Sequence, residues 1–124
     1  MLLRAAAPRR PHANALRRPA AAFRALASRF DFSRYSSLLD VGGSAATLSC
    51  AVAAAHPHMR CASADLPPLL GAARSQIARA GLEGRVRAEA LDFFAAEEFP
   101  AADIITMSMI LHDCASCRTH WQLQ

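Results

Sequence analysis

The sequence predicts an α/β fold built on a parallel sheet, and three observations support this prediction. First, from Phe32 onward short apolar segments alternate with helix-like segments in the order β-α-β-α-β-loop-β, which is typical of parallel strands joined by helical crossovers. Second, paired glycines, Gly42 and Gly43, follow the first apolar segment. Third, each of the first two apolar segments closes with an acid, Asp40 or Asp65.

The first strand is predicted at Leu38–Val41, and an alanine-rich helix follows at Ala45–Ala55. The helix should end at His56-Pro57, because proline excludes the residue before it from helical geometry. A second strand is predicted at Met59–Ala64. These three elements form the first β-α-β unit of the sheet.

A second helix is predicted at Pro67–Ala80, with proline in its first turn and Gly81 as its left-handed stop. Three apolar residues at helical spacing should form its buried face: Leu70, Ala73 and Ile77. The third strand is expected at Arg85–Leu91 and is followed by an acidic loop, Ala95–Pro100.

The run Asp103–Leu111 is rich in Ile, Thr and Met, which predicts a fourth strand buried on both faces. The paired glycines alone are a weak signal, because a plain tight turn has the same composition. Asp65, however, lies 25 residues beyond Asp40, about where a carboxylate at the end of a second strand would bind ribose hydroxyls. A nucleotide-binding turn is therefore favoured.

Length and composition set the limits of this interpretation. A chain of 124 residues forms at most one domain, and a hydrophobic content of 53% argues against wholesale disorder. The basic residues are 14 Arg and no Lys, and Ala is abundant, which indicates a coding bias. The net charge of +4 therefore does not predict a nucleic-acid partner.

The first thirty residues hold seven Arg and no acid. We expect residues 1–29 to be a basic leader or linker, in which Pro8, Pro11 and Pro19 prevent a long helix and a short helix covers Ala20–Arg29. An organelle-targeting segment and a phosphate-binding arm are the alternatives. No stretch reaches the roughly 18 apolar residues of a membrane span, so a soluble, cytoplasmic protein without a membrane partner is expected.

The four cysteines are expected to be reduced thiols, because the chain shows no apolar signal segment of a secreted protein. Cys114, Cys117 and His120 have a spacing that zinc sites use, and His112 would be a fourth ligand. A complete tetrahedral site within nine residues would be sterically awkward, so we expect no metal.

Six segments, taken in order, carry a family resemblance: Phe-Asp-Phe-Ser-Arg-Tyr at 30–35, Leu-Leu-Asp-Val-Gly-Gly at 38–43, Asp-Leu-Pro-Pro at 65–68, Gly-Leu-Glu-Gly-Arg-Val at 81–86, Leu-Asp-Phe-Phe at 91–94 and Ala-Asp-Ile-Ile-Thr-Met-Ser-Met-Ile-Leu-His-Asp at 102–113. Over roughly residues 22–113 the chain resembles the S-adenosylmethionine-dependent O-methyltransferases of small hydroxylated molecules. Caffeate, acetylserotonin and polyketide hydroxyl methyltransferases belong to this family.

The resemblance implies a partial Rossmann-like methyltransferase sheet with parallel strands in the order 3-2-1-4. The carboxylates of Asp40, Asp65 and Asp92 should then gather at the carboxyl ends of the strands, where ligands bind in open α/β sheets. The fourth strand should lie at an exposed edge of the sheet and promote self-association.

The resemblance also implies S-adenosylmethionine as the cofactor and a small-molecule hydroxyl as the substrate. The implied cofactor-binding residues are Asp40, Gly42, Gly43, Asp65, Leu66, Asp92 and Phe93. Gly42 would lie under the methionine and ribose portions, and Asp65 would accept from the ribose hydroxyls. Asp92 would accept from the adenine amino group while Phe93 packs on the purine.

His112 would be the general base that takes the proton from the substrate hydroxyl, a task that suits a near-neutral imidazole. Structural alternatives remain open for each residue. Asp65 and Asp92 are also suited to turns or helix caps, Phe93 to the core, and His112 to a hydrogen bond near a strand end.

The chain also departs from the family pattern. Ser44 and Ala46 stand where the family turn usually continues with glycines, so two Cβ atoms intrude there. Ser108 and Cys114 replace a usual lysine and tryptophan.

The resemblance stops after Asp113, which predicts a partial catalytic domain at residues 30–113 and an unmatched tail at 114–124. The later strands and the N-terminal domain through which the full-length family forms homodimers would be missing, so we expect a truncated and inactive fragment. The alternative is a non-catalytic cofactor-binding or subunit-pairing module. A nicotinamide-dependent dehydrogenase is disfavoured, since the G-x-G-x-x-G spacing is absent.

Overall fold

The computed structural model describes residues 13–108, which form a four-stranded sheet and its helices. The helices are α1 (Ala13–Arg29), α2 (Thr47–Ala55), the short 3-10 helix η1 (Pro67–Leu69) and α3 (Leu70–Arg79). The strands are β1 (Ser37–Val41), β2 (Arg60–Asp65), β3 (Val86–Ala90) and β4 (Ile104–Thr106). All strand pairs are parallel and the order is β3-β2-β1-β4, which confirms the predicted fold class and order.

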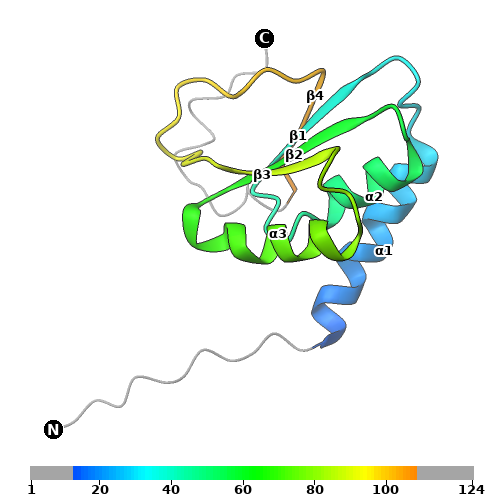
Figure 1. Cartoon of the computed structure of the whole chain (residues 1–124), viewed down its shortest axis with the longest axis horizontal. Helices are drawn as coiled ribbons and strands as arrows, with labels where there is room; N and C mark the ends of the chain where they lie inside the picture. Colours follow the sequence, from blue (N-terminus) through cyan, green and yellow to red (C-terminus); the bar gives the residue numbers. More distant parts are fainter. Residues whose placement is uncertain (1–12, 109–124) are drawn as a thin grey trace, which may run out of the picture.

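The sheet has two differently covered faces. The helices α1, α2 and α3 lie on one face, and the segment between β3 and β4 runs along the other (Figure 1). The helix side holds the larger core, in which Leu38, Cys61 and Val86 lie across the three neighbouring strands β1, β2 and β3. Leu39 and Ala62 point to the opposite face, because successive strand residues alternate between faces.

The ends of α2 and α3 follow local sequence signals. The helix α2 stops before His56-Pro57, as predicted. Gly81 adopts φ 66° after α3, and the Leu82 N–H donates to the Ile77 carbonyl oxygen at 3.1 Å. This pattern is a Schellman stop, which requires a left-handed residue and so favours glycine. The predicted inner face of α3 is confirmed, because Leu70, Ala73 and Ile77 are all buried.

The prediction that proline would restrict the first helix to Ala20–Arg29 was wrong. The helix α1 starts at Ala13 and runs through Pro19. Proline removes one backbone hydrogen bond and disturbs the preceding turn, but the helix beyond it remains intact. Phe23 and Ala27 anchor that later part in the main core, and the His56 ring nitrogen Nε2 lies 2.6 Å from the carbonyl oxygen of Ala27.

The prediction of a long, doubly buried fourth strand was also wrong. The strand β4 has three residues, and its central Ile105 is 43% exposed. Met107 and Ser108 lie beyond the strand, and residues 109–111 lie outside the described part of the chain. Within that part β4 pairs only with β1, which confirms the predicted edge position and explains the incomplete burial.

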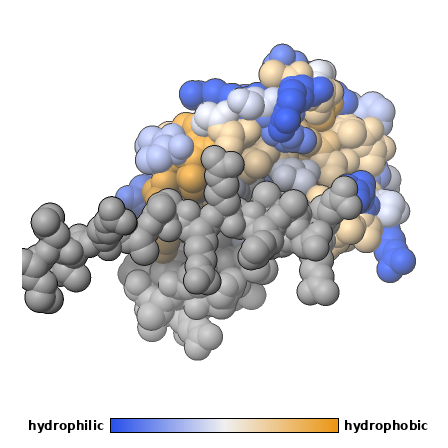
Figure 2. Space-filling model, turned by 90° about the horizontal axis from the view of Figure 1, so that it is seen from below, coloured by the Kyte–Doolittle hydropathy of each residue, from blue (hydrophilic) through white to orange (hydrophobic). Residues whose placement is uncertain are grey.

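The surface seen from below combines moderately hydrophobic areas with projecting hydrophilic residues (Figure 2). On α3, for example, Arg74 and Arg79 are exposed. Among the described residues, no helix is both long and apolar enough to cross a membrane.

Candidate cofactor site

The turn after β1 contains three left-handed residues within five positions. Gly42 has φ 71°, Ser44 has φ 48° and Ala46 has φ 58°. The Gly42 N–H donates to the Ala64 carbonyl oxygen at 2.7 Å, so the turn stays bound to β2 as the chain leaves β1. The backbone thus keeps the left-handed conformations that glycine adopts most easily, although two of the three left-handed residues carry a Cβ atom.

Gly43 lies against polar side chains of two strands. A Cβ at this position would overlap the Ser63 hydroxyl and lie 2.8 Å from Asp40 Oδ2. Real Cβ atoms do not approach other atoms this closely, so the position requires glycine for space. The second of the paired glycines is therefore explained by its contact with β1 and β2.

Asp65 ends β2 directly beside this turn. Its Oδ2 accepts from the Ser44 N–H at 2.8 Å, and its Oδ1 accepts from the Leu66 N–H at 2.8 Å. The residue is buried, yet each carboxylate oxygen has a second lone pair for another donor. The carboxylate is thereby fixed in orientation and remains able to accept from a pair of hydroxyls.

Asp40 lies beneath the turn in the middle of the sheet. It is fully buried, and the Thr106 hydroxyl donates to its Oδ1 at 2.8 Å. Burial raises the pKa of Asp40 from 3.8 to about 6; the Thr106 hydrogen bond opposes this shift and the nearby charge of Asp65 adds to it. Asp40 therefore supports the turn from below, and its contact with Thr106 joins β1 to β4.

Ser63 is the third polar residue under the turn. It pairs with Asp40 across β1 and β2, and its hydroxyl faces Gly43. Within the described part of the chain its buried oxygen has no hydrogen-bond partner. Most buried hydroxyls are paired, so this one marks a place where the polar environment is incomplete.

Asp92 and Phe93 follow β3, at the same end of the sheet as Asp65. The Asp92 carboxylate accepts from the Phe94 N–H at 3.1 Å, which is the turn role that the sequence left open. Phe93 is 9% exposed and packs with Leu39 and neighbouring residues on the sheet face opposite the helices. The ring of Phe94, 58% exposed and 4.5 Å from that of Phe93, is the one open to solvent.

The predicted residues thus fall into two groups. Gly42, Gly43, Asp65 and Leu66 form the turn and its acidic neighbour, with Asp40 beneath them. Asp92 and Phe93 form the second group, in the segment after β3. The predicted base His112 and the possible zinc ligands Cys114, Cys117 and His120 lie outside the described residues. Within residues 13–108 no group of three metal-ligating side chains occurs.

Sequence reasoning missed Ser63 and Thr106, which lie under the turn, and Phe94, which follows β3. Thr106 contacts Asp40 only because β4 pairs with β1 in a register that sets these residues side by side. The predicted strand order places β4 beside β1, but only the tertiary structure shows that register. Phe94 was visible as the second ring of a Phe-Phe pair, but the sequence alone does not say which ring faces solvent.

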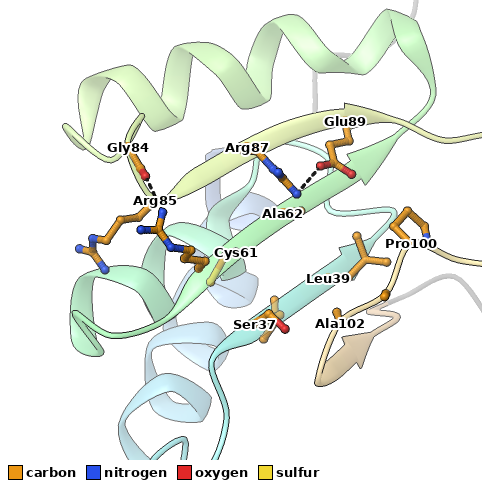
Figure 3. A pocket seen from close by; sticks show the side chains of 13 residues that line it. Ser37, Leu39, Cys61, Ala62, Gly84, Arg85, Arg87, Glu89, Pro100 and Ala102 are labelled. Carbon is orange, nitrogen blue, oxygen red and sulfur yellow. Dashed lines mark hydrogen bonds and ion pairs between the residues drawn. The ribbon is translucent and has the colours of Figure 1, made fainter.

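A cavity lies elsewhere, on the sheet face opposite the helices (Figure 3). It encloses about 240 Å³ between strand residues such as Leu39 and Ala62 and the segment around Ala102. Arg87 lies at its rim and forms an ion pair with Glu89 at 2.7 Å. None of the residues of the glycine turn lines it, so it is separate from the candidate cofactor site.

Together, the strand order, the left-handed turn after β1 and the fixed carboxylate at the end of β2 define a Rossmann-like, nucleotide-cofactor-binding fold. A family model described as an O-methyltransferase domain matches residues 19–123, and the chain belongs to this family. The matched range begins before Phe30 and continues past Asp113, while the domain boundaries at residues 29 and 113 stay predictions.

Among curated relatives, the N,N-dimethyltransferase OxyT of Streptomyces rimosus is 43% identical over 88 residues, covering 71% of this chain and 25% of the relative. The 3-hydroxy-5-methyl-1-naphthoate 3-O-methyltransferase of Streptomyces sahachiroi is 39% identical over 90 residues, covering 73% of this chain and 26% of the relative. The chain therefore spans about a quarter of the length of these relatives.

Solved structures agree with the family. The mitomycin 7-O-methyltransferase MmcR superposes with a TM-score of 0.73 at 30% identity, over 80% of this chain and 29% of that protein. The O-methyltransferase NcsB1 of neocarzinostatin biosynthesis superposes with a TM-score of 0.68 at 27% identity, over 75% of this chain and 28% of that protein. The NcsB1 structure contains S-adenosylmethionine and 2-hydroxy-5-methyl naphthoic acid.

Proposed function

We propose that this chain forms the cofactor-binding part of an S-adenosylmethionine-dependent methyltransferase that acts on small hydroxylated molecules. The observation that carries the proposal is the Asp65 carboxylate, held by the Ser44 and Leu66 N–H groups beside a left-handed turn. This arrangement presents two fixed acceptor oxygens to a ribose diol. Family membership and the ligand in the NcsB1 structure support the choice of cofactor.

The bound cofactor would supply a sulfonium methyl group with a good leaving group. The protein's main task is then to align donor and acceptor. Gly42 lets the backbone approach the cofactor, and Asp65 accepts from the ribose hydroxyls. Asp92, with the adjacent Phe93 and the exposed ring of Phe94, lies at the strand end where the adenine would bind.

The acceptor is proposed to be the hydroxyl of a small aromatic or polyketide-like molecule, with His112 as the base that takes its proton. Two relatives support this substrate class: one is named as a naphthoate O-methyltransferase and the other as an 8-O-methyltransferase of tetracenomycin polyketide synthesis. An amine acceptor is the second candidate, because the relative with 43% identity is named as an N,N-dimethyltransferase.

A non-catalytic cofactor-binding or subunit-pairing role is the alternative, and the edge position of β4 supports it. Homodimer formation by the whole protein is likewise a proposal, and we assign no nucleic-acid or membrane partner. A cytoplasmic location is proposed because the thiols of Cys50 and Cys61 are unpaired.

Calorimetric titration tests cofactor binding. The 124-residue chain should bind S-adenosylhomocysteine but not NAD, and Asp65→Ala should abolish binding while the exposed control Glu83→Gln leaves it unchanged. Circular dichroism would verify that the variants fold. Equal binding by wild type and Asp65→Ala would disprove the cofactor assignment.

A radiolabelled-methyl assay over a panel of phenols, hydroxynaphthoates and amines tests the reaction and its acceptor. Turnover that is lost in His112→Ala, with cofactor binding retained, would support the base. We expect binding to be detectable more readily than turnover, because most of the proposed contacts are with the adenosine part of the cofactor.

A further inference from the structure

We propose that the Ser44 hydroxyl is an additional ribose-binding group of the cofactor site, acting beside Asp65. This inference rests on the proposed function, since it assigns a contact within the same site. It concerns a residue at which the chain departs from the glycines of the family turn.

The first argument is the position of Ser44. Its own N–H holds Asp65 Oδ2 at 2.8 Å, so Ser44 is the residue of the turn that lies directly against this carboxylate. A serine Oγ lies about 3 Å from its own backbone nitrogen by covalent geometry. The Ser44 hydroxyl is therefore within about 6 Å of Asp65 Oδ2, a separation that one ribose hydroxyl bound between them can span.

The second argument is chemical complementarity. A carboxylate only accepts hydrogen bonds, whereas a serine hydroxyl both donates and accepts. A ribose hydroxyl that donates to Asp65 keeps lone pairs that the Ser44 hydroxyl can satisfy. Ser44 is exposed, and no hydrogen bond of its hydroxyl occurs among the described residues, so the group is free to bind a ligand.

The third argument is the unrelieved strain of the residue. Left-handed geometry costs an L-residue other than glycine about 1–2 kcal/mol. Residues in such conformations cluster at ligand-binding sites, where function compensates the strain. Ala46 has the same backbone geometry but is completely buried, so it cannot touch a ligand and provides an internal comparison.

A further observation concerns the buried side of the turn. The Ser63 hydroxyl is 1% exposed, lacks a partner among the described residues, and points at Gly43 from beneath the turn. Gly43 thus packs on the buried side chains of Ser63 and Asp40, whereas the next residue, Ser44, is exposed.

Titration calorimetry of the full chain with S-adenosylhomocysteine provides the test. We expect Ser44→Ala to weaken binding about fivefold to tenfold, the value of one hydrogen bond. The control Ala46→Gly, which changes backbone strain without facing the ligand, should leave the affinity within twofold of wild type. The penalty of Ser44→Ala should disappear with analogues lacking the 2′- or the 3′-hydroxyl.

Ser44→Gly separates the hydroxyl from the strain. It should raise the melting temperature, because glycine adopts φ 48° freely, and it should still weaken binding. Unchanged or tighter binding by Ser44→Ala and Ser44→Gly would overturn the inference. It would show that the Ser44 side chain contributes nothing to cofactor binding or hinders it.

The outcomes separate this inference from the proposed function. If wild type binds and Asp65→Ala does not, the cofactor site stands, and the Ser44 variants alone decide the inference. If wild type does not bind S-adenosylhomocysteine, both are overturned. Circular dichroism of each variant identifies any loss of fold.

Discussion

The buried polar residues under the glycine turn determine how the stability of the turn depends on pH. Asp40 is buried with Ser63 beside it and Thr106 donating to one of its oxygens. Burial disfavours the charged form of a carboxyl group, which is the main reason that its pKa rises to about 6. The residue therefore links protonation to the stability of the turn.

We predict that Asp40→Asn removes a pH dependence of stability. In the unfolded chain Asp40 titrates near pH 4, and in the folded chain near pH 6. Between these values the folded chain binds the extra proton, so its stability falls as pH rises from about 4 to 6. The variant, which keeps an acceptor for Thr106, should be about 1–3 kcal/mol more stable than wild type at pH 7.

Urea unfolding at pH 4, 5, 6 and 7 measures this effect. Wild type and Asp40→Asn should converge at the acid end, and the exposed control Glu97→Gln should follow wild type throughout. A variant that is less stable than wild type at pH 7 would show instead that the ionised carboxylate stabilises the turn.

At the scale of elements, helix ends and strand starts are fixed by single residues. The stop of α3 depends on the left-handed Gly81, whereas Gly71 lies inside the same helix without any such requirement. A Cβ at either position would meet no atom within 4 Å. The two glycines therefore form a matched pair that differs in backbone geometry.

We predict opposite effects of alanine at these two positions. Gly71→Ala should stabilise the chain by about 0.5–1 kcal/mol, because alanine is the better helix former. Gly81→Ala should destabilise it by about 1 kcal/mol, because φ 66° is strained for an L-residue. Thermal unfolding of both variants measures the signs, and a stabilising Gly81→Ala would contradict the proposed stop of α3.

The start of β4 depends on Asp103. Its Oδ2 accepts from the Ser36 N–H at 2.7 Å, the Ser36 hydroxyl at 2.8 Å and the Ser37 N–H at 3.1 Å. The bond from the Ser36 N–H contributes most to lowering the pKa of Asp103 below 3.8. These bonds fasten the beginning of β4 to the beginning of β1.

We predict that Asp103→Ala loosens β4 while the rest of the sheet stays ordered. Because the folded pKa is lowered, the stabilisation by Asp103 is present above about pH 4 and is lost as pH falls through the folded value. Hydrogen exchange at pH 7 should show faster exchange of the Thr106 amide, which the register directs toward β1, with little change at Ala62. Unchanged protection of β4 would mean that its pairing with β1 suffices without Asp103.

At the scale of the whole molecule, the described sheet is covered by helices on one face only (Figure 1). Parallel sheets normally have both faces covered. Among residues 13–108, β4 forms an open edge, and the cavity at Leu39 and Ala62 lies on the less covered face (Figure 3). These features favour association with another protein surface, as the sequence led us to expect.

We predict concentration-dependent self-association through the β4 edge. Ile105→Lys should shift the chain toward monomer in sedimentation velocity, because edge charges oppose strand pairing. Leu69→Lys is the matched control, since Leu69 is equally exposed at 43% but lies on the 3-10 helix before α3. A monodisperse monomer at high concentration, or equal effects of both variants, would contradict this role of β4.

Local signals in the sequence determined much of the fold. His56-Pro57 and Gly81 ended their helices where predicted, because proline and left-handed glycine act on the backbone within one or two residues. The apolar segments and the helices between them predicted the parallel sheet, and the family resemblance predicted its strand order, which the structure confirms. The turn after β1 and the acid at the end of β2 were likewise visible, since both follow from residue type and spacing.

Only the tertiary structure decided which groups meet. Thr106 reaches Asp40 through the register of β4, and Phe93 faces the core while Phe94 faces solvent, because strand pairing and packing set these directions. The structure also shows that α1 runs through Pro19, whereas the contacts of Phe23 and Ala27 with the core hold the part of the helix after this proline. Local backbone preferences depend on neighbouring residues in the sequence, whereas contacts between distant segments depend on how the whole chain packs.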